Sequence, residues 1–127
     1  MISTIAMVGA GGAIGAIARY GVNVGSVHLF GHGFPWGTVI VNVIGSFLMG
    51  VLIAKFAMMD NISNDMKTML TTGVLGAFTT FSTFSLDFVT LWERGEMVQA
   101  FGYMAVSVVL SILALFFALW VMRGMAS

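Results

Sequence analysis

The sequence TTGVLGAFTTFSTFS, at residues 71–85, is the most unusual part of this 127-residue chain. Seven of its fifteen residues carry a hydroxyl group and two are glycine, although it lies in the middle of a stretch long enough to cross a membrane. Glycine and clustered Thr or Ser weaken a helix. In a membrane, a break is tolerated only where the backbone lines a cavity or binds an ion. We therefore expect a helix broken at mid-membrane, whose freed carbonyl groups suit a hard cation.

The composition of the whole chain is that of a membrane protein. Hydrophobic residues make up 59% of the sequence and charged residues only 8%, with five Lys or Arg balancing five Asp or Glu. A soluble domain averages about 25% charged residues. This composition excludes an ordinary soluble domain, a disordered tail and a nucleic-acid-binding protein, which needs a basic face. The chain has no cysteine, so disulfides and thiolate metal sites are excluded, and we interpret His28 and His32 as loop residues.

Four stretches of the sequence are long and apolar enough to be transmembrane helices. A bilayer core about 30 Å thick needs about 20 apolar residues per helix. We therefore predict an all-α membrane protein that forms a single four-helix transmembrane domain. The predicted helices cover residues 2–22, 35–57, 66–92 and 97–122.

The charges give little preference for one orientation in the membrane. Four helices place both termini on the same side, together with Lys55, Lys67 and Arg123. Arg19 and Arg94 fall on the opposite side. Orientation follows the Lys and Arg bias between the two sides, and three against two is almost no bias. Either the chain inserts both ways, which permits an antiparallel homodimer, or it has one fixed topology with a weak bias.

Polar residues inside two of the predicted helices follow helical spacing. A polar side chain in hydrocarbon costs free energy unless it is paired, so two such stripes could line a water-poor path. The alternative is that the Ser and Thr hydroxyls bond their own backbone or serve as small packing residues. The stripes consist of Thr38, Asn42 and Ser46 in the second helix, and Gln99, Tyr103, Ser107 and Ser111 in the fourth.

The chemistry of such a path would suit a small anion. Phe78, Phe81, Phe84 and Phe88 recur at helical spacing, and the edge of an aromatic ring carries partial positive charge. Such a stripe also occurs in ordinary core packing. We expect no Lys, Arg or His in the middle of a span, so the partners of an ion would be amide N–H groups, hydroxyls and ring edges.

Arg19 and Asp87 are charged residues near the ends of their predicted helices, and both are expected to be solvated. Arg19 could extend its head group from the end of the first helix. Asp87 is expected near the end of the third, as a solvated carboxylate or a vestibule residue. Neither forms part of a recognisable catalytic group, so the sequence contains no candidate apparatus for an enzyme.

The motifs resemble the CrcB-type (Fluc) family of fluoride ion channels over almost the whole chain. Gly12-x-x-Gly15 precedes Arg19-Tyr20, and Trp36-Gly37-Thr38 precedes Asn42-x-x-Gly45. The most specific motif is Gly73-x-x-Gly76-x-x-Thr79-Thr80-Phe81-Ser82-Thr83-Phe84-Ser85.

This resemblance implies a fluoride-selective channel that exports fluoride passively from the cytoplasm and lowers its toxicity. It implies an antiparallel, dual-topology homodimer with two pores in a bacterial plasma (inner) membrane. Backbone carbonyls of Gly76 and Thr79 from both subunits would hold a structural sodium ion at the dimer interface. The residues that match the family's fluoride pathway are Asn42, Phe81, Phe84, Thr83, Tyr103, Ser107 and Ser111, with Thr38 on the same face as Asn42.

Arg19 and Asp87 lie at the edge of the family pattern. Arg19 matches an arginine that the family carries at the end of its first helix, whereas Asp87 stands where family members often have Glu.

A proton-coupled, dual-topology exporter of small molecules is the alternative function, and it needs an intramembrane carboxylate. A third possibility is an assembly factor that transports nothing.

Overall fold

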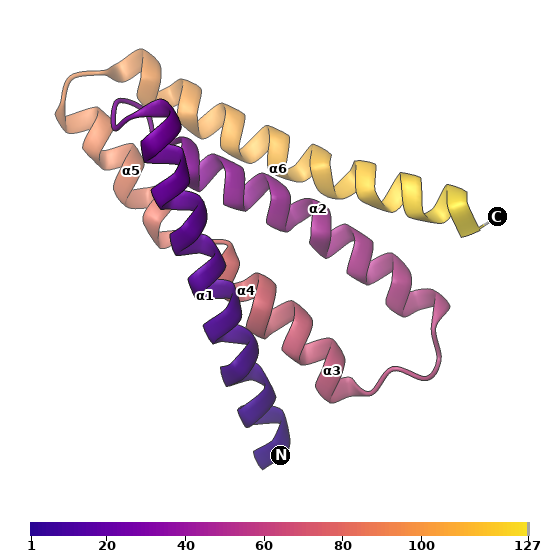
Figure 1. Cartoon of the computed structure of the whole chain (residues 1–127). Helices are drawn as coiled ribbons and strands as arrows, with labels where there is room; N and C mark the ends of the chain where they lie inside the picture. The colour runs from indigo at the N-terminus through magenta and orange to yellow at the C-terminus, as the bar shows by residue number, and fades with distance from the viewer. Residues whose placement is uncertain (127) are drawn as a thin grey trace.

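The computed structural model describes residues 1–126 and consists of helices joined by short connections (Figure 1). Four helical stretches, Ile2–Phe30, Trp36–Met58, Asn64–Glu93 and Met97–Met125, are long and apolar enough to cross a membrane. This confirms the prediction of an all-α protein with four candidate membrane spans. In chain order the elements are α1 (Ile2–Phe30), α2 (Trp36–Met58), α3 (Asn64–Thr68), η1 (Met69–Leu75), α4 (Gly76–Phe78), α5 (Ser82–Glu93) and α6 (Met97–Ala126).

The helices form two closely packed groups. α2 packs mainly against α6, whereas α1 packs mainly against η1 and α4. Figure 1 shows the two groups converging near α5 and diverging toward the ends that carry the chain termini. α5 joins them, because it follows α4 in the chain and packs against α6. The third candidate span therefore belongs to one group in its first half and to the other in its second half.

The first helix is longer than the sequence analysis predicted. It continues past residue 22 to Phe30, where Gly31 ends it at φ 78° and donates its N–H to the Val27 carbonyl at 2.8 Å. A positive φ favours glycine, which is why a helix stops readily there. The polar Ser26 does not end the helix, because its hydroxyl donates to the Val22 carbonyl one turn earlier at 2.8 Å. The predicted connection after residue 22 is thus largely helical.

The third span is interrupted halfway along its length. Its first half ends in η1, a π-helix, followed by the single turn α4. Residues Thr79–Phe81 are not helical, and α5 resumes at Ser82. π-helical turns are rare and occur mostly as single-turn bulges, often at functional sites. The glycine- and hydroxyl-rich segment that indicated a weak helix is therefore where the backbone leaves α-helical geometry.

Close contacts between α1 and the π-helix depend on small residues. A Cβ added at Gly15 would collide with the Val74 carbonyl, and one at Gly11 would lie 2.7 Å from the Met69 carbonyl oxygen. On the other side of the break, a Cβ at Gly45 of α2 would collide with the Thr79 side chain. Membrane helices associate through such close approach because lipid gives no hydrophobic drive for it. These glycines hold the interrupted segment between α1 and α2.

Candidate functional site

A cavity of about 390 Å³ opens beside the interruption, between α2, α5 and α6, and we call it the break cavity. Both polar stripes predicted from the sequence contribute to it, together with the non-helical residues and two phenylalanines. Its polar lining is Asn42, Ser46, Thr79, Thr80, Ser107 and Ser111, and its aromatic lining is Phe81 and Phe84.

Asn42 holds the interrupted backbone in place. Its Nδ2 donates to the Thr80 carbonyl at 3.0 Å, and its Oδ1 accepts the Thr80 N–H at 2.8 Å. The amide thus supplies both hydrogen-bond partners that a regular helix would have given the backbone N–H and carbonyl of Thr80. One of the two Nδ2 hydrogens remains for a ligand in the break cavity.

Several backbone carbonyls lose their ordinary helical donors at the interruption, and those of Gly76 and Thr79 are two of them. In an α-helix the Gly76 carbonyl would accept the Thr80 N–H, and the Thr79 carbonyl would accept the Thr83 N–H. Here the Thr80 N–H binds Asn42 instead, and the Thr83 N–H donates to the Thr80 hydroxyl at 3.2 Å. These two carbonyls belong to the residues for which the family resemblance implies a sodium ion.

Arg19 is not at a helix end, contrary to the prediction. Because α1 continues to Phe30, Arg19 lies well inside it, and its Nε donates to the Ala77 carbonyl at 3.1 Å. Ala77 lies in α4, between the two carbonyls described above. The expectation that no basic residue lies in the middle of a span is therefore wrong for α1. A guanidinium group stands beside the break.

The position of Arg19 also changes the charge count on which orientation depends. Lys55, Lys67 and Arg123 remain near the helix ends on the side of the termini, whereas only Arg94 remains on the other side. A count of three against one is a clearer bias than three against two. The charge pattern therefore supports dual insertion less than the sequence analysis indicated.

Two serines of α6 present hydroxyl groups with no partner among the described residues. Ser107 is buried, Ser111 is partly buried, and the Oγ atoms of both are shielded from solvent without a hydrogen bond. Both line the break cavity. A buried hydroxyl without a partner is costly, so a ligand that accepts hydrogen bonds would be stabilised here. Gln99, at the start of the same predicted stripe, is exposed and does not line the cavity.

The phenylalanines of the motif differ in their exposure. The rings of Phe81 and Phe84 have centroids 5.7 Å apart, and the Phe84 ring lies 5.2 Å from that of Tyr103. Phe84 is partly buried, whereas Phe81 is 78% exposed. Phe81 therefore presents most of its ring outside this single chain.

Asp87 lies near the end of the third candidate span, as expected, but its carboxylate is held by hydrogen bonds and is not a freely solvated group. It lies in the middle of α5, and its Oδ2 accepts the Thr38 hydroxyl at 2.7 Å and the Tyr103 hydroxyl at 3.0 Å. These bonds join α5 to α2 and α6. Tyr103, which is fully buried, is thus a partner of Asp87 and does not line the break cavity.

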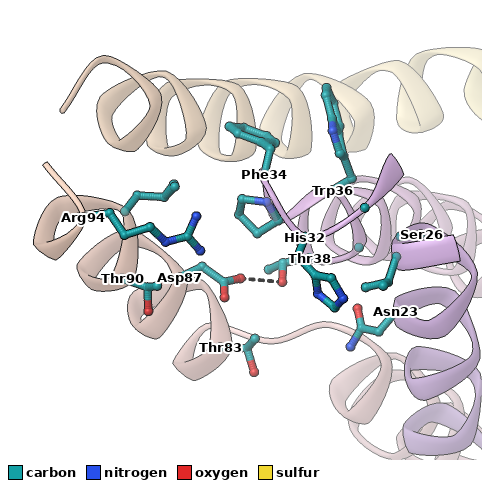
Figure 2. Close-up of a pocket in the computed structure, with 15 residues that line it drawn as sticks. Asn23, Ser26, His32, Phe34, Trp36, Thr38, Thr83, Asp87, Thr90 and Arg94 are labelled. Carbon is teal, nitrogen blue, oxygen red and sulfur yellow. Dashed lines mark hydrogen bonds between the residues drawn. The ribbon is translucent and has the colours of Figure 1, made fainter. Parts of the chain in front are cut away.

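A second cavity of about 230 Å³ lies beyond Asp87, and we call it the end cavity (Figure 2). It is lined by the end of α1, the start of α2 and the side of α5, together with the loop between the first two helices. Thr38 and Thr83 of the predicted pathway line it, together with Asp87. The sequence analysis missed His32 and Asn23, which also line it. Their sequence context gave no signal beyond polar residues near a loop.

The donor chemistry of the site is consistent with an ion pathway and not with a metal cluster of side chains. Within residues 1–126, no three His, Asp or Glu residues come together as metal ligands. The groups that line the break cavity are an amide, hydroxyls, ring edges and backbone. Four helices long and apolar enough to cross a membrane, with such a cavity between them, are typical of a multi-pass membrane protein.

Comparison with known proteins gives the family. Residues 6–119 match the family described as CrcB-like protein, Camphor Resistance (CrcB). The chain is 50% identical over 115 residues to the fluoride-specific ion channel FluC of Mesorhizobium japonicum, covering 91% of this chain and 92% of that protein. It is 53% identical over 124 residues to the protein of the same name from Cereibacter sphaeroides, covering 98% of each. The chain belongs to the CrcB-like family, as the sequence motifs predicted.

Proposed function

We propose that this chain is a fluoride-selective channel that lets fluoride leave the cytoplasm passively, and that it is not an enzyme. The observation that carries the proposal is the pair of hydroxyls of Ser107 and Ser111, which have no hydrogen-bond partner among the described residues and belong to residues that line the same cavity as Asn42. Fluoride is small and accepts strong hydrogen bonds. Relatives that share about half of their residues with this chain are named fluoride-specific ion channels, which supports the same choice of ion.

The mechanism is the exchange of water for uncharged donors along the break cavity. Fluoride binds water tightly, so it enters only where protein groups replace that water. The free Nδ2 hydrogen of Asn42 and the two serine hydroxyls supply hydrogen bonds, and the edges of Phe81 and Phe84 supply weak positive potential. None of these groups carries a full charge, so binding stays weak enough for release. A membrane potential that is negative inside favours anion exit.

The carbonyls of Gly76 and Thr79 fit a structural sodium ion. Hard cations prefer oxygen ligands, and both carbonyls have lost their helical N–H donors to Asn42 and to the Thr80 hydroxyl. When bound, sodium would neutralise the negative ends of these peptide dipoles. Two carbonyls are too few ligands for one ion, so the proposed site is completed by the same residues of a second copy.

A second copy, inserted in the opposite orientation, would form an antiparallel homodimer with two pores. The exposed Phe81 ring supports this arrangement, because a ring that lines the cavity on one side is left largely uncovered by its own chain. The proposed location is a bacterial plasma (inner) membrane, which the four candidate spans and the bacterial relatives support. Dual insertion requires the bias of three basic residues against one to be overcome during assembly.

Proton-coupled export, the alternative function, has no support from the relatives, which are named ion channels. Asp87 is the one carboxylate in the middle of a helix that could exchange a proton among residues 1–126, and its Oδ2 is held by two hydroxyl groups.

Fluoride efflux from liposomes that contain the purified protein tests the proposal, with a fluoride electrode as the readout. We expect rapid efflux driven by the electrical gradient, without a proton gradient, and little efflux of chloride. Phe81→Ile keeps an apolar side chain but removes the ring edge, so it should reduce fluoride flux while the protein still elutes as an assembled species. Sealed vesicles, or flux that depends on a proton gradient, would contradict the channel.

A further inference from the structure

Ser46 of α2 lines the break cavity, and the proposed pathway gives it no role. It stands one helical turn after Asn42 and is partly buried. Its hydroxyl has no hydrogen-bond partner within residues 1–126. A polar group inside a membrane span costs free energy unless another group pairs with it. The Ser46 hydroxyl is therefore available to a ligand that enters the break cavity.

Many hydroxyl groups along the helical spans are satisfied by their own backbone. Each donates to the carbonyl one turn earlier, which is a common way for a helix to accommodate Ser and Thr. The residues that do so are Ser26, Thr68, Thr71, Thr79, Ser85 and Thr90. Ser46, Ser107 and Ser111 do not, and all three line the break cavity. One cavity thus collects three hydroxyl groups that the described chain does not use.

The packing of α2 against α6 places Ser46 and Ser111 at the same level of the cavity. The two helices lie side by side and run in the same direction (Figure 1). A Cβ added at Gly50 would lie 2.8 Å from the Leu115 carbonyl oxygen, so these two residues are neighbours across the interface. Ser46 is one turn before Gly50, and Ser111 is one turn before Leu115. The two serines therefore belong to opposite walls at one depth.

A first level of donors lies one further turn back, at Asn42 and Ser107. Four residues of an α-helix span about 6 Å, so the two levels are close enough for an ion to move directly between them. In the other direction the lining continues with Met49 and Leu115, which are apolar. The two serines of the second level are therefore the last hydroxyl groups that α2 and α6 offer on this side of the cavity.

We propose that Ser46 is a fluoride-contacting residue, which forms with Ser111 a second binding site for the anion one turn from Asn42 and Ser107. The inference rests on the proposed channel function and adds a donor from α2 to the serines of α6. Two hydroxyls from opposite walls replace water around the ion where much of the remaining lining is apolar. Conduction needs several weak sites in place of one strong site, and two uncharged donors provide such a site.

The test is fluoride efflux from liposomes, with a fluoride electrode as the readout. Ser46→Ala should lower the flux about tenfold, the lower end of the effect of losing a hydrogen bond to a charged group, because water replaces part of the lost donor. Its elution in gel filtration and its Tm in detergent should stay those of the wild type, since the hydroxyl has no protein partner. Ser3→Ala is the matched control, because its hydroxyl bonds Asp65 outside both cavities, and it should keep full flux.

A pair of larger side chains separates hydrogen bonding from packing. Thr and Val are both β-branched and similar in shape, and only Thr has a hydroxyl, so Ser46→Thr should keep most of the flux that Ser46→Val loses. Wild-type flux in Ser46→Ala, or equal losses in the Thr and Val variants, would overturn the role of Ser46 while leaving the channel intact. Wild-type protein that passes no fluoride would instead overturn the channel and the second site together.

The partnership with Ser111 is tested in a double variant. In the Ser111→Ala background, Ser46→Ala removes the last protein hydroxyl of the second level, so the fold-loss in flux should be larger than in the wild-type background. The same fold-loss in both backgrounds would show that the two serines do not share a site.

Discussion

Asn42 and Thr80 are joined by two hydrogen bonds, in which the side-chain amide of one residue binds both the carbonyl and the N–H of the other, at 3.0 and 2.8 Å. The residues lie on different helical spans, 38 positions apart. This pair replaces, from outside the helix, the backbone partners that the interruption removes. Asn42 therefore has a structural role at the break in addition to any contact with an ion.

Replacement of Asn42 should destabilise the protein as well as reduce flux. Asn42→Ala leaves the Thr80 N–H and carbonyl without partners, and each unsatisfied buried group costs about 1–3 kcal/mol. We expect a loss of about 2–4 kcal/mol in the free energy of unfolding, measured by chemical denaturation in detergent. Asn42→Asp, which keeps the acceptor for the N–H, should lose less stability but as much fluoride flux. Wild-type stability in Asn42→Ala would show that the amide does not hold the break.

Removal of the Ser107 and Ser111 hydroxyls should separate conduction from stability. Because neither hydroxyl has a protein partner, Ser107→Ala and Ser111→Ala should change the free energy of unfolding by no more than about 0.5 kcal/mol. Fluoride flux should fall in both. Thr68→Val is a matched control, since its hydroxyl bonds only the Asn64 carbonyl outside both cavities. Equal flux in all three variants would remove these serines from the pathway.

Two glycines of α1 should respond in opposite ways to alanine. Gly15→Ala places a Cβ against the Val74 carbonyl, so α1 must move away from the π-helix, at a cost of about 1–3 kcal/mol. A Cβ at Gly12 meets nothing within 4 Å, so Gly12→Ala should cost nothing and slightly favour the helix. Thermal unfolding in detergent measures both. A similar Tm for the two variants would contradict the close approach of α1.

The Asp87–Tyr103 bond should appear as a coupling in a double-mutant cycle. Tyr103→Phe and Asp87→Asn each disturb the bond of 3.0 Å, so their effects on stability should not add, with an interaction energy of about 0.5–3 kcal/mol. Tyr20→Phe serves as the control, because Tyr20 is 71% exposed and lies on another helix. Its effect should add to that of Asp87→Asn. Additive effects in both cycles would show that Asp87 is not energetically coupled to Tyr103 of α6.

Arg19 should be needed for stability although it touches no proposed ligand. Arg19→Gln removes the charged donor to the Ala77 carbonyl, and hydrogen bonds to charged groups contribute about 1.5–3 kcal/mol. We expect a loss of that size in chemical denaturation. Arg123→Gln, at an exposed position near the end of α6, should change stability by less than about 0.5 kcal/mol. Equal losses would indicate a general effect of charge.

The sequence predicted the helical class, the four spans and the place of the interruption, because each depends on local composition. Length and apolarity define a span, and the run of hydroxyl groups and glycine from Thr71 to Ser85 marks the weak segment. The end of α1 was placed too early because Asn23 begins a more polar stretch, while Ser26 satisfies its hydroxyl within the helix. Helix ends depend on such single hydrogen bonds, which spacing alone does not reveal.

The two polar stripes predicted some of the residues that line the break cavity but not the hydrogen-bond partners of the others. Asn42, Ser107 and Ser111 share a cavity, as the two stripes indicated. Thr38 and Tyr103 instead donate hydrogen bonds to Asp87, and Arg19 donates one to the Ala77 carbonyl beside the break. These three contacts join residues far apart in the chain, so they depend on how the helices pack and leave no periodic signal in the sequence.

The interior position of Arg19 has a consequence for how the chain is made. A charged residue at the centre of a helix opposes its insertion by about 2.5–3.5 kcal/mol, and the most apolar window of α1 has a mean hydropathy of 1.4, against 2.6 for α6. The acceptor that relieves this cost, the Ala77 carbonyl, is synthesised 58 residues later. During translation α1 alone is thus a weak membrane anchor. It gains its hydrogen-bond acceptor only after α4 has been synthesised, so the first helix to be made is among the last to be stabilised.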